Sequence, residues 1–316
     1  MKHPARSEYS CSVLVMSCMV SATPWSVGVP WRIVRAMPAS RSRTHVAILF
    51  SEHAAPERYV ISKLADYWRQ DGLLVDYLFE TTRFVPADVL MLHVDLSVLP
   101  RRILSFASRY PRVINQHVSD IRKRTFSTLI VPRPSEHAGP VIVKTNLNFG
   151  GGPESGNHPN PLVRSYHRAR RLYLRMLTGS WGYRIYPSTQ AVPKLAWCDP
   201  YLVVEKFVPE RLGDEYAVRV YNFFGERDSS FLVTSPDPIV KGGAEARIRP
   251  LEPDPRLRAL RRSLKLDYGK IDYVLSGGEP IVLDINKTVG LTDIADEPSV
   301  EHARRERARA IYDFLP

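Results

Sequence analysis

The chain has 316 residues and carries 44 lysine and arginine side chains against 33 acidic ones, a formal net charge of +11 at pH 7. With 44% hydrophobic and 24% charged residues its composition is that of an ordinary globular protein, which argues against a fibrous or globally disordered chain. No stretch approaches the ~20 consecutive apolar residues that cross a bilayer, so we do not expect an integral membrane protein. The length predicts about two domains.

The first 43 residues differ from the rest. They hold +5 of the net charge, and the remaining 273 residues hold only +6. Cys11 and Cys18 also lie there, which leaves Cys198 alone in the body, so we expect no disulfide framework and a reducing, cytoplasmic setting. The segment resembles a secretory signal only weakly, because serines interrupt its short apolar run. We expect a disordered or wrongly assigned extension, with Met37 as an alternative start.

Strands and helices alternate in the next part of the chain. Apolar runs predict strands at 45–50, 73–79, 88–96 and 111–116, and helical spacing predicts helices at 58–70 and 98–110. This alternation predicts a parallel α/β sheet over residues 44–118. No G-x-G-x-x-G follows the first strand and no G-x-x-x-x-G-K-[ST] occurs, so neither a dinucleotide-binding fingerprint nor a P-loop is expected.

The remainder has a different pattern. Helices are expected at 119–127, 161–178 and 254–265, and strands at 139–146, 201–208, 215–224, 230–234, 270–275 and 280–286. Many strands with few helices predict an α+β region with antiparallel sheet.

The last two of these strands form a predicted hairpin with chemistry on it. Asp284 and Asn286 are two residues apart on a strand, so both side chains project from one face. A three-residue turn at Gly277–Glu279 would place Asp272 opposite Asp284, whereas a two-residue turn would place it opposite Leu283. Because cross-strand partners lie ~5 Å apart and like charges repel, two facing carboxylates indicate a hard divalent cation. The alternative is a solvated strand end with unpaired polar residues.

A second motif combines a lysine with glycines. Lys144 ends an apolar strand, and Gly150, Gly151 and Gly152 follow it in a loop. Such glycines let backbone N–H groups approach an anion closely, which suits a triphosphate under a movable flap. The alternative is a flexible surface loop with a solvated lysine.

A third motif is the strand that ends in Glu205, Lys206 and Phe207. Its backbone can offer hydrogen bonds to the edge of an adenine, and Glu215 can accept hydrogen bonds from ribose hydroxyls. The alternative is a partly buried strand with two surface charges.

The order of these three motifs resembles the ATP-grasp superfamily, which includes D-alanine–D-alanine ligase, glutathione synthetase and the ribosomal-protein glutamate ligases. The resemblance covers about residues 112–290. It implies an α/β and α+β chain with the ATP-grasp fold over 119–316, made of a central part at about 119–204 and a C-terminal part at about 205–316. A Rossmann-like pre-ATP-grasp domain at 44–118 would precede it, after the extension 1–43.

The resemblance also implies roles for individual residues. Lys123 and Lys144 would contact ATP phosphates, with Gly150, Gly151 and Gly152 as the flap, and Glu205, Lys206 and Phe207 would bind adenine. Glu215 would bind the ribose, with Glu210 as the alternative residue for that role. The metal ligands would be Asp272, Asp284 and Asn286, and the catalytic residues, which steady phosphate oxygens, would be Lys270 and Arg219. Two departures stand out: Asp120 lies three residues before Lys123 instead of beside it, so Arg122 could substitute, and Asp284 replaces the commoner glutamate.

The implied activity is that of an ATP-dependent carboxylate–amine or carboxylate–thiol ligase, acting through an acyl phosphate and releasing ADP and phosphate. Its cofactors would be ATP and Mg²⁺, as one ion or two, with Mn²⁺ able to substitute. Carboxylate and amine substrates, small molecules or peptides, would be its partners. No membrane partner is expected, and a homo-oligomer is compatible with the sequence.

Three alternatives stay open. The same fold could serve a small-molecule kinase, in which a hydroxyl accepts the phosphoryl group. It could also be a scaffold that binds nucleotide without turnover. A basic nucleic-acid-binding protein is the third, disfavoured alternative, supported by arginines at positions 164, 168, 170, 171 and 175 on one predicted helix and at 101, 102, 109 and 112.

Overall fold

The structure is a computed structural model, and it describes residues 44–79, 81–158, 160–179, 182–241, 247–291 and 298–316. The extension expected over residues 1–43 lies outside the described residues. Within them, no helix combines the length and apolar character that crossing a membrane requires.

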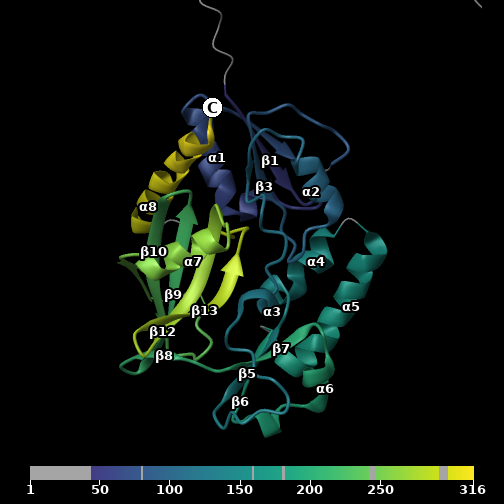
Figure 1. Ribbon diagram of the computed structural model, residues 1–316, viewed down its shortest axis with the longest axis vertical. Coiled ribbons are helices and arrows are strands. Elements are labelled where there is room, and N and C mark those ends of the chain that lie inside the picture. The colour runs from purple at the N-terminus through teal and green to yellow at the C-terminus, as the bar shows by residue number, and fades with distance from the viewer. Residues whose placement is uncertain (1–43, 80, 159, 180–181, 242–246, 292–297) are drawn as a thin grey trace, which may run out of the picture. The chain divides into compact units, whose positions relative to one another are not determined.

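The first part of the described chain contains a four-stranded parallel sheet, as the sequence predicts. Its strands are β1 (His45–Phe50), β2 (Leu74–Leu78), β3 (Val89–His93) and β4 (Val113–Ile114), in the order β2-β1-β3-β4. The 3₁₀ turn η1 (Pro56–Arg58) leads into α1 (Val60–Gln70), and α2 (Arg101–Ala107) follows β3. The helix α1 lies on one face of the sheet and α2 on the other (Figure 1). Their buried side chains share hydrophobic clusters with the sheet residues on those faces, so both faces are covered.

A second, antiparallel sheet has three strands. They are β6 (Tyr183–Tyr186), β5 (Val141–Thr145) and β7 (Leu202–Lys206), in that order, with β5 in the middle. Around them lie α3 (Lys123–Phe126), η2 (Asn148–Gly151), α4 (Gly152–Asn157), α5 (Pro161–Thr178), η3 (Thr189–Ala191) and α6 (Lys194–Cys198). The helix α5 begins where the Asn160 side chain accepts hydrogen bonds from the backbone of Leu162 and Val163, and it ends at Gly179 with φ 73°.

The helix expected over residues 119–127 is reduced to the single turn of α3. Asp120 forms a bridge with Val98, and its carboxylate accepts a hydrogen bond from the backbone N–H of Arg122 at 2.9 Å. These contacts hold the first residues of the segment in an extended form, so the helix starts at Lys123.

The third sheet is antiparallel and has six strands. The main order is β11 (Arg247–Leu251), β10 (Arg227–Ser235), β9 (Glu215–Phe224), β12 (Tyr268–Ser276) and β13 (Glu279–Asn286), and β8 (Glu210–Leu212) pairs with β9. The helix α7 (Pro255–Ser263) packs Leu257 against buried residues of one face. The chain closes with α8 (Pro298–Ala308) and η4 (Arg309–Phe314), whose buried residues share a cluster with Trp68 of α1 and Phe224 of β9. This shared cluster ties the parallel sheet to the six-stranded one.

The β12–β13 hairpin differs from the prediction in its turn. Ser276 pairs with Glu279, so the turn has two residues, Gly277 and Gly278, with φ of 59° and 82°. Such positive φ values suit glycine and the tight turns of hairpins. The predicted three-residue turn is therefore wrong.

The predicted pairing of the two aspartates is nevertheless present. Tyr273 pairs with Val282 and Asp272 with Asp284, so Leu283 is the extra residue of a β-bulge. The bulge restores the register that the shorter turn would otherwise lose.

Candidate functional site

Polar side chains form a line across one face of the six-stranded sheet. Ser229 pairs with Asn222, Asn222 with Lys270, and Lys270 with Asn286, on β10, β9, β12 and β13 in turn. Because directly paired residues of neighbouring strands point to the same side, these four side chains share a face. We call them the polar row.

A second line runs beside the polar row on the same face. Phe231 pairs with Val220, Val220 with Asp272, and Asp272 with Asp284. Four residues predicted for the site are thereby brought together: Lys270, Asp272, Asp284 and Asn286. They lie at the β12–β13 end of the face, whereas the second line ends on β10 at the apolar Phe231.

Two predicted lysines reach this hairpin from the other antiparallel sheet and its surroundings. Lys123 is buried, and its Nζ lies 3.3 Å from Oδ1 of Asp284. Burial alone would lower the pKa of Lys123, but the charges of Asp284 and Glu205 outweigh it and raise that pKa. Lys144, from β5, lies 2.7 Å from Oε2 of Glu205 and 3.5 Å from the backbone oxygen of Leu283.

Each aspartate of the hairpin therefore has a lysine beside it. Lys270 Nζ lies 2.9 Å from Oδ2 of Asp272, and this carboxylate raises the pKa of Lys270 against the opposite effect of burial. Two facing carboxylates supply the hard oxygen ligands that Mg²⁺ takes, so Asp272 and Asp284 fit such an ion. Among the described residues, no group of three or more histidine, cysteine, aspartate or glutamate side chains is placed to hold a metal.

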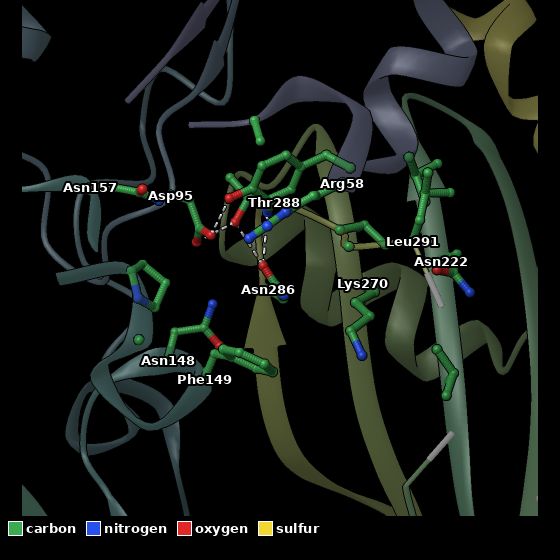
Figure 2. Close-up of a pocket in the computed structure, with 18 of the residues that line it drawn as sticks. Arg58, Asp95, Asn148, Phe149, Asn157, Asn222, Lys270, Asn286, Thr288 and Leu291 are labelled. Atoms are coloured by element: carbon green, nitrogen blue, oxygen red, sulfur yellow. Dashed lines mark hydrogen bonds between the residues drawn. The ribbon is translucent and has the colours of Figure 1, made fainter. Parts of the chain in front are cut away.

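Asn286 is oriented toward a different partner. Its Oδ1 accepts a hydrogen bond from the backbone N–H of Thr288 at 2.8 Å and lies 3.1 Å from the Thr288 hydroxyl. That hydroxyl donates to Asp95 at 2.8 Å, and the Tyr59 hydroxyl donates to the same carboxylate at 2.8 Å (Figure 2). The amide oxygen of Asn286 would have to turn from Thr288 to reach a metal between the aspartates.

Asp95 and Thr288 are site residues that the sequence analysis missed. Burial raises the pKa of Asp95, although its hydrogen bonds from Thr288 and Tyr59 favour the ionised form. The available signal was weak: Asp95 follows the apolar run of β3, where polar residues at the carboxyl end of a parallel strand often line a ligand site.

A cavity of about 670 Å³ opens over the polar row. Its walls include Lys270 and Asn286 from the sheet, Asp95 from the end of β3, and Asn148 and Phe149 from η2 (Figure 2). The buried trio of Lys123, Lys144 and Glu205 does not line it. The site therefore has two compartments, the lysine-rich contact between the sheets and the cavity beside it.

The glycine motif forms a tight, left-handed turn at the edge of this cavity. Phe149, Gly150 and Gly151 have φ of 45°, 64° and 72°, and the two glycines adopt this conformation without strain. The backbone N–H of Asn148 donates to the Ser97 hydroxyl at 2.8 Å. The turn is thereby attached to the loop that follows β3, and Gly152 lines the cavity.

The predicted adenine strand is already hydrogen-bonded. Lys206 N–H donates to the Leu129 oxygen at 2.8 Å, and Phe207 N–H donates to the Pro140 oxygen at 3.0 Å. The Glu205 side chain is fully buried against Lys144, while the Lys206 side chain is exposed. Backbone contacts to adenine from this strand would thus have to come from carbonyl groups.

Arg219 and Glu215 are not brought to the polar row. Arg219 pairs with Tyr273, one residue out of step with the Val220–Asp272 pair, so it points to the opposite face of the sheet. There it forms a two-pronged ion pair with Glu210, with Nη2 2.7 Å from Oε1. Glu215 is on the same side as Arg219 and lies 3.6 Å from Arg247.

Comparisons with known proteins give similar folds and no relative in sequence. No family model matches the chain, and no curated protein matches it in sequence. Among solved structures, it is similar to D-alanine–D-alanine ligase from Bacillus anthracis complexed with ATP, at 12% identity and TM-score 0.47, over 86% of this chain and 96% of that one. It is also similar to the D-cycloserine synthetase DcsG, at 14% identity and TM-score 0.45, over 85% and 99% of the two chains.

A third similar structure is a RimK domain ATP-grasp protein from Sphaerobacter thermophilus, at 14% identity and TM-score 0.43, over 86% of this chain and 99% of that one. The chain resembles ATP-grasp proteins. Because these TM-scores lie below 0.5, the function proposed below rests on the side chains of this chain and not on these likenesses.

Proposed function

We propose that the chain is an ATP-dependent ligase that joins a carboxylate to an amine or a thiol. The observation that carries this proposal is the meeting of Lys123 with Asp284, and of Lys144 with the backbone of Leu283, between two antiparallel sheets. Lysines can hold the phosphate oxygens of a magnesium–triphosphate complex, and carboxylates can hold its Mg²⁺. In this proposal residues 44–118 are a Rossmann-like domain that precedes an ATP-grasp body at 119–316.

The side chains have distinct tasks in the proposed reaction. Lys123 and Lys144 would hold ATP phosphate oxygens, and Lys270 would orient the substrate carboxylate. A divalent ion bound by Asp272 and Asp284 would supply charge neutralisation at the phosphates. A carboxylate oxygen then bonds to the γ-phosphorus while the bond to ADP breaks, which yields an acyl phosphate.

In the second step the nucleophile reacts with the acyl carbon. An amine nitrogen bonds to this carbon, phosphate leaves with the electron pair of the C–O bond, and the nitrogen gives up a proton. Asp95, held by Thr288 and Tyr59 in the cavity, is the carboxylate placed to accept that proton. The protein contributes position and electrostatics, without a covalent nucleophile.

A small-molecule kinase is the second candidate, since the same residues would serve transfer to a hydroxyl. Analysis of the product separates the two. Incubation of the protein with Mg²⁺, ATP and pooled carboxylic acids and amines should release ADP. It should also yield an amide whose mass equals that of the acid plus the amine less one water. A stable phosphate ester instead would show a kinase.

The nucleic-acid alternative finds little support on α5. Several of its arginines are engaged within the protein: Arg164 donates to the backbone oxygen of His158, Arg168 to that of Ser155, and Arg170 forms an ion pair with Asp199. Apolar side chains lie among the exposed Arg168 and Arg175 of this helix, with Leu162 and Leu172 79% and 69% exposed. A basic face suited to a phosphate backbone would instead present free arginines.

The decisive experiment measures nucleotide binding with a matched control. Wild-type protein should be stabilised against heat by ATP with Mg²⁺, and Asp272→Asn should lose most of that stabilisation. Asp66→Asn, on the exposed side of α1, should behave like wild type. Equal stabilisation of all three proteins would refute the site, and no stabilisation of the wild type would refute the function.

A further inference from the structure

Arg307 stands at the far end of the polar row. This residue of α8 is only 6% exposed, and its Nη1 lies 3.4 Å from the hydroxyl of Ser229, the β10 member of the row. Among the residues that the structure describes, Arg307 has no carboxylate partner, and it lines the cavity. Buried charges are normally paired, so a buried arginine that faces a cavity needs an anion from elsewhere.

The surroundings of Arg307 do not supply that charge. Burial, together with the charge of Arg304 on the same helix, lowers the pKa of Arg307 to about 10, against the opposite effect of Tyr268. Arg304 lines the same cavity, and its Nη1 lies 2.6 Å from Glu301. The cavity lining also includes Arg58 and Arg171, whereas Asp95 is the only carboxylate among the described residues that line it.

The strand pairing gives the distance between the two ends of the polar row, Ser229 beside Arg307 and Lys270. Ser229 and Lys270 both pair with Asn222, one from each side, so they lie two strands apart. Neighbouring strands are about 4.8 Å apart, which places the Arg307 end about 10 Å from the Lys270 end.

The floor between the two ends is apolar on one side. Phe231 and Val220 lie beside the polar row, and Val233 and Ile248, themselves a pair, continue the wall. A ligand that lies along this floor meets a cation at each end, and between them it meets the Asn222 amide on one side and the hydrocarbon wall on the other.

We propose that the cavity binds a small dicarboxylic acid, with the reacting carboxylate at Lys270 and Asn286 and the second carboxylate on Arg307. This inference rests on the proposed function, which fixes how the dicarboxylate is oriented: its reacting carboxylate must face the proposed ATP phosphate site. The apolar wall selects a hydrocarbon chain between the carboxylates, and the strand spacing sets its length. Because Arg304 is paired with Glu301, the Arg307 guanidinium and the Ser229 hydroxyl beside it match a singly charged carboxylate at the far end.

The test uses binding and turnover of a chain-length series. Linear dicarboxylates from succinate to sebacate are compared with monocarboxylates of equal length, by calorimetry and by ATP-dependent ADP release. One of the longer dicarboxylates should bind about tenfold or more tightly than its monocarboxylate partner, because a charge-assisted hydrogen bond to a buried group is lost in the latter. Equal affinities across the series would overturn the inference.

Variants separate this site from the nucleotide site. Arg307→Met should abolish the preference for the dicarboxylate and leave ATP-dependent thermal stabilisation unchanged. Arg307→Lys should retain part of the preference, and Arg309→Met, at an exposed arginine paired with Glu306, should retain all of it. If Arg307→Met fails to fold, Ser229→Ala is measured instead, and its preference for the dicarboxylate over the monocarboxylate should be weaker than that of the wild type.

The outcomes distinguish the two proposals. Dicarboxylate binding that depends on Arg307, in a protein that does not bind ATP, would support the anion site and refute the proposed ligase. ATP binding with no preference for dicarboxylates in the wild type would refute the anion site alone. A preference that survives Arg307→Met in a folded protein would also refute it.

Discussion

Asp272 lies directly opposite Asp284 across the β12–β13 hairpin, and a β-bulge at Leu283 places it there. Without the bulge, the two-residue turn would have paired Asp272 with Leu283, and one of the two carboxylates would point to the other face of the sheet. Bulges near active sites commonly redirect side chains in this way. The pairing is the geometric basis on which we propose a divalent-ion site.

The two aspartates should differ in what their removal does. Asp272→Asn leaves behind Lys270, whose side chain is 27% exposed, so the variant should fold like wild type. It should lower ATP turnover about 100-fold or more, because it removes a ligand of the proposed ion that neutralises phosphate charge. Steady-state ADP release over a range of Mg²⁺ concentrations checks this, and a turnover near the wild-type value would exclude Asp272 from the site.

Asp284→Asn should in addition destabilise the fold. It removes the carboxylate beside Lys123, whose side chain is only 2% exposed, and an uncompensated buried charge costs about 3–5 kcal/mol as an upper range. Urea unfolding of Asp284→Asn against Asp272→Asn measures the difference. Equal stabilities would show that Lys123 does not depend on Asp284.

Lys144 needs a paired substitution to reveal its role. Glu205 is fully buried, and Lys144 is its ion-pair partner at 2.7 Å, so Lys144→Met alone leaves a buried carboxylate uncompensated and should cost about 3–5 kcal/mol. The double variant Lys144→Met/Glu205→Gln should recover most of that stability yet still fail to bind ATP. Urea unfolding and nucleotide titration of both proteins give the two readings. ATP binding by the double variant would mean that Lys144 serves the fold alone.

Substitution of Thr288 tests the proposed role of Asp95 as the carboxylate that accepts the proton of the amine. Thr288→Val removes the hydroxyl that donates to Asp95, a loss of about 1–3 kcal/mol where a buried acceptor is left with fewer partners. Thr288→Ser keeps the hydroxyl and should behave like wild type. In the ligase assay Thr288→Val should raise the KM for the amine and leave ATP affinity unchanged. A change in ATP affinity alone would contradict the placement of Asp95 at the amine.

The sequence predicted the positions of the strands and helices better than the pairing between strands and the faces on which the side chains lie. Short apolar runs located β1, β3 and β5, since buried strands need little beyond such runs. The bulge at Leu283 has no sequence signal, and it cancelled the error in turn length. Arg219 lies on the face opposite the polar row, and this could not be predicted because it depends on the register between β9 and β12, which is set by tertiary pairing and not by local pattern.

The cavity could not be predicted for the same reason. Asp95 and Thr288 are 193 residues apart in sequence, and Arg307 reaches Ser229 across 78 residues. Each of these side chains has an unremarkable neighbourhood along the chain. Only the packing of α8 and the end of β3 against the six-stranded sheet brings them to one site.

His93, the last residue of β3, should make stability depend on pH. It is 1% exposed, its ring lies 5.1 Å from that of Phe50 and 5.0 Å from that of Tyr59, and neither ring nitrogen has a hydrogen-bond partner among the described residues. Burial, with the charge of Lys287 adding to it, lowers the pKa of His93 to about 3.

The sign of the effect follows from proton uptake. A histidine in the unfolded chain has a pKa of about 6.5, so between about pH 6.5 and 3 the unfolded state binds a proton that the folded state does not. The free energy of unfolding should therefore fall by about 1 kcal/mol per pH unit as the pH drops through this range, in addition to the effect of other groups. His93→Phe fits the aromatic surroundings and should remove this part of the slope without loss of stability at pH 8. Urea unfolding at several pH values checks it, with His302→Phe at an exposed site as the control. Equal slopes for wild type and His93→Phe would mean that the ring is protonated in the fold.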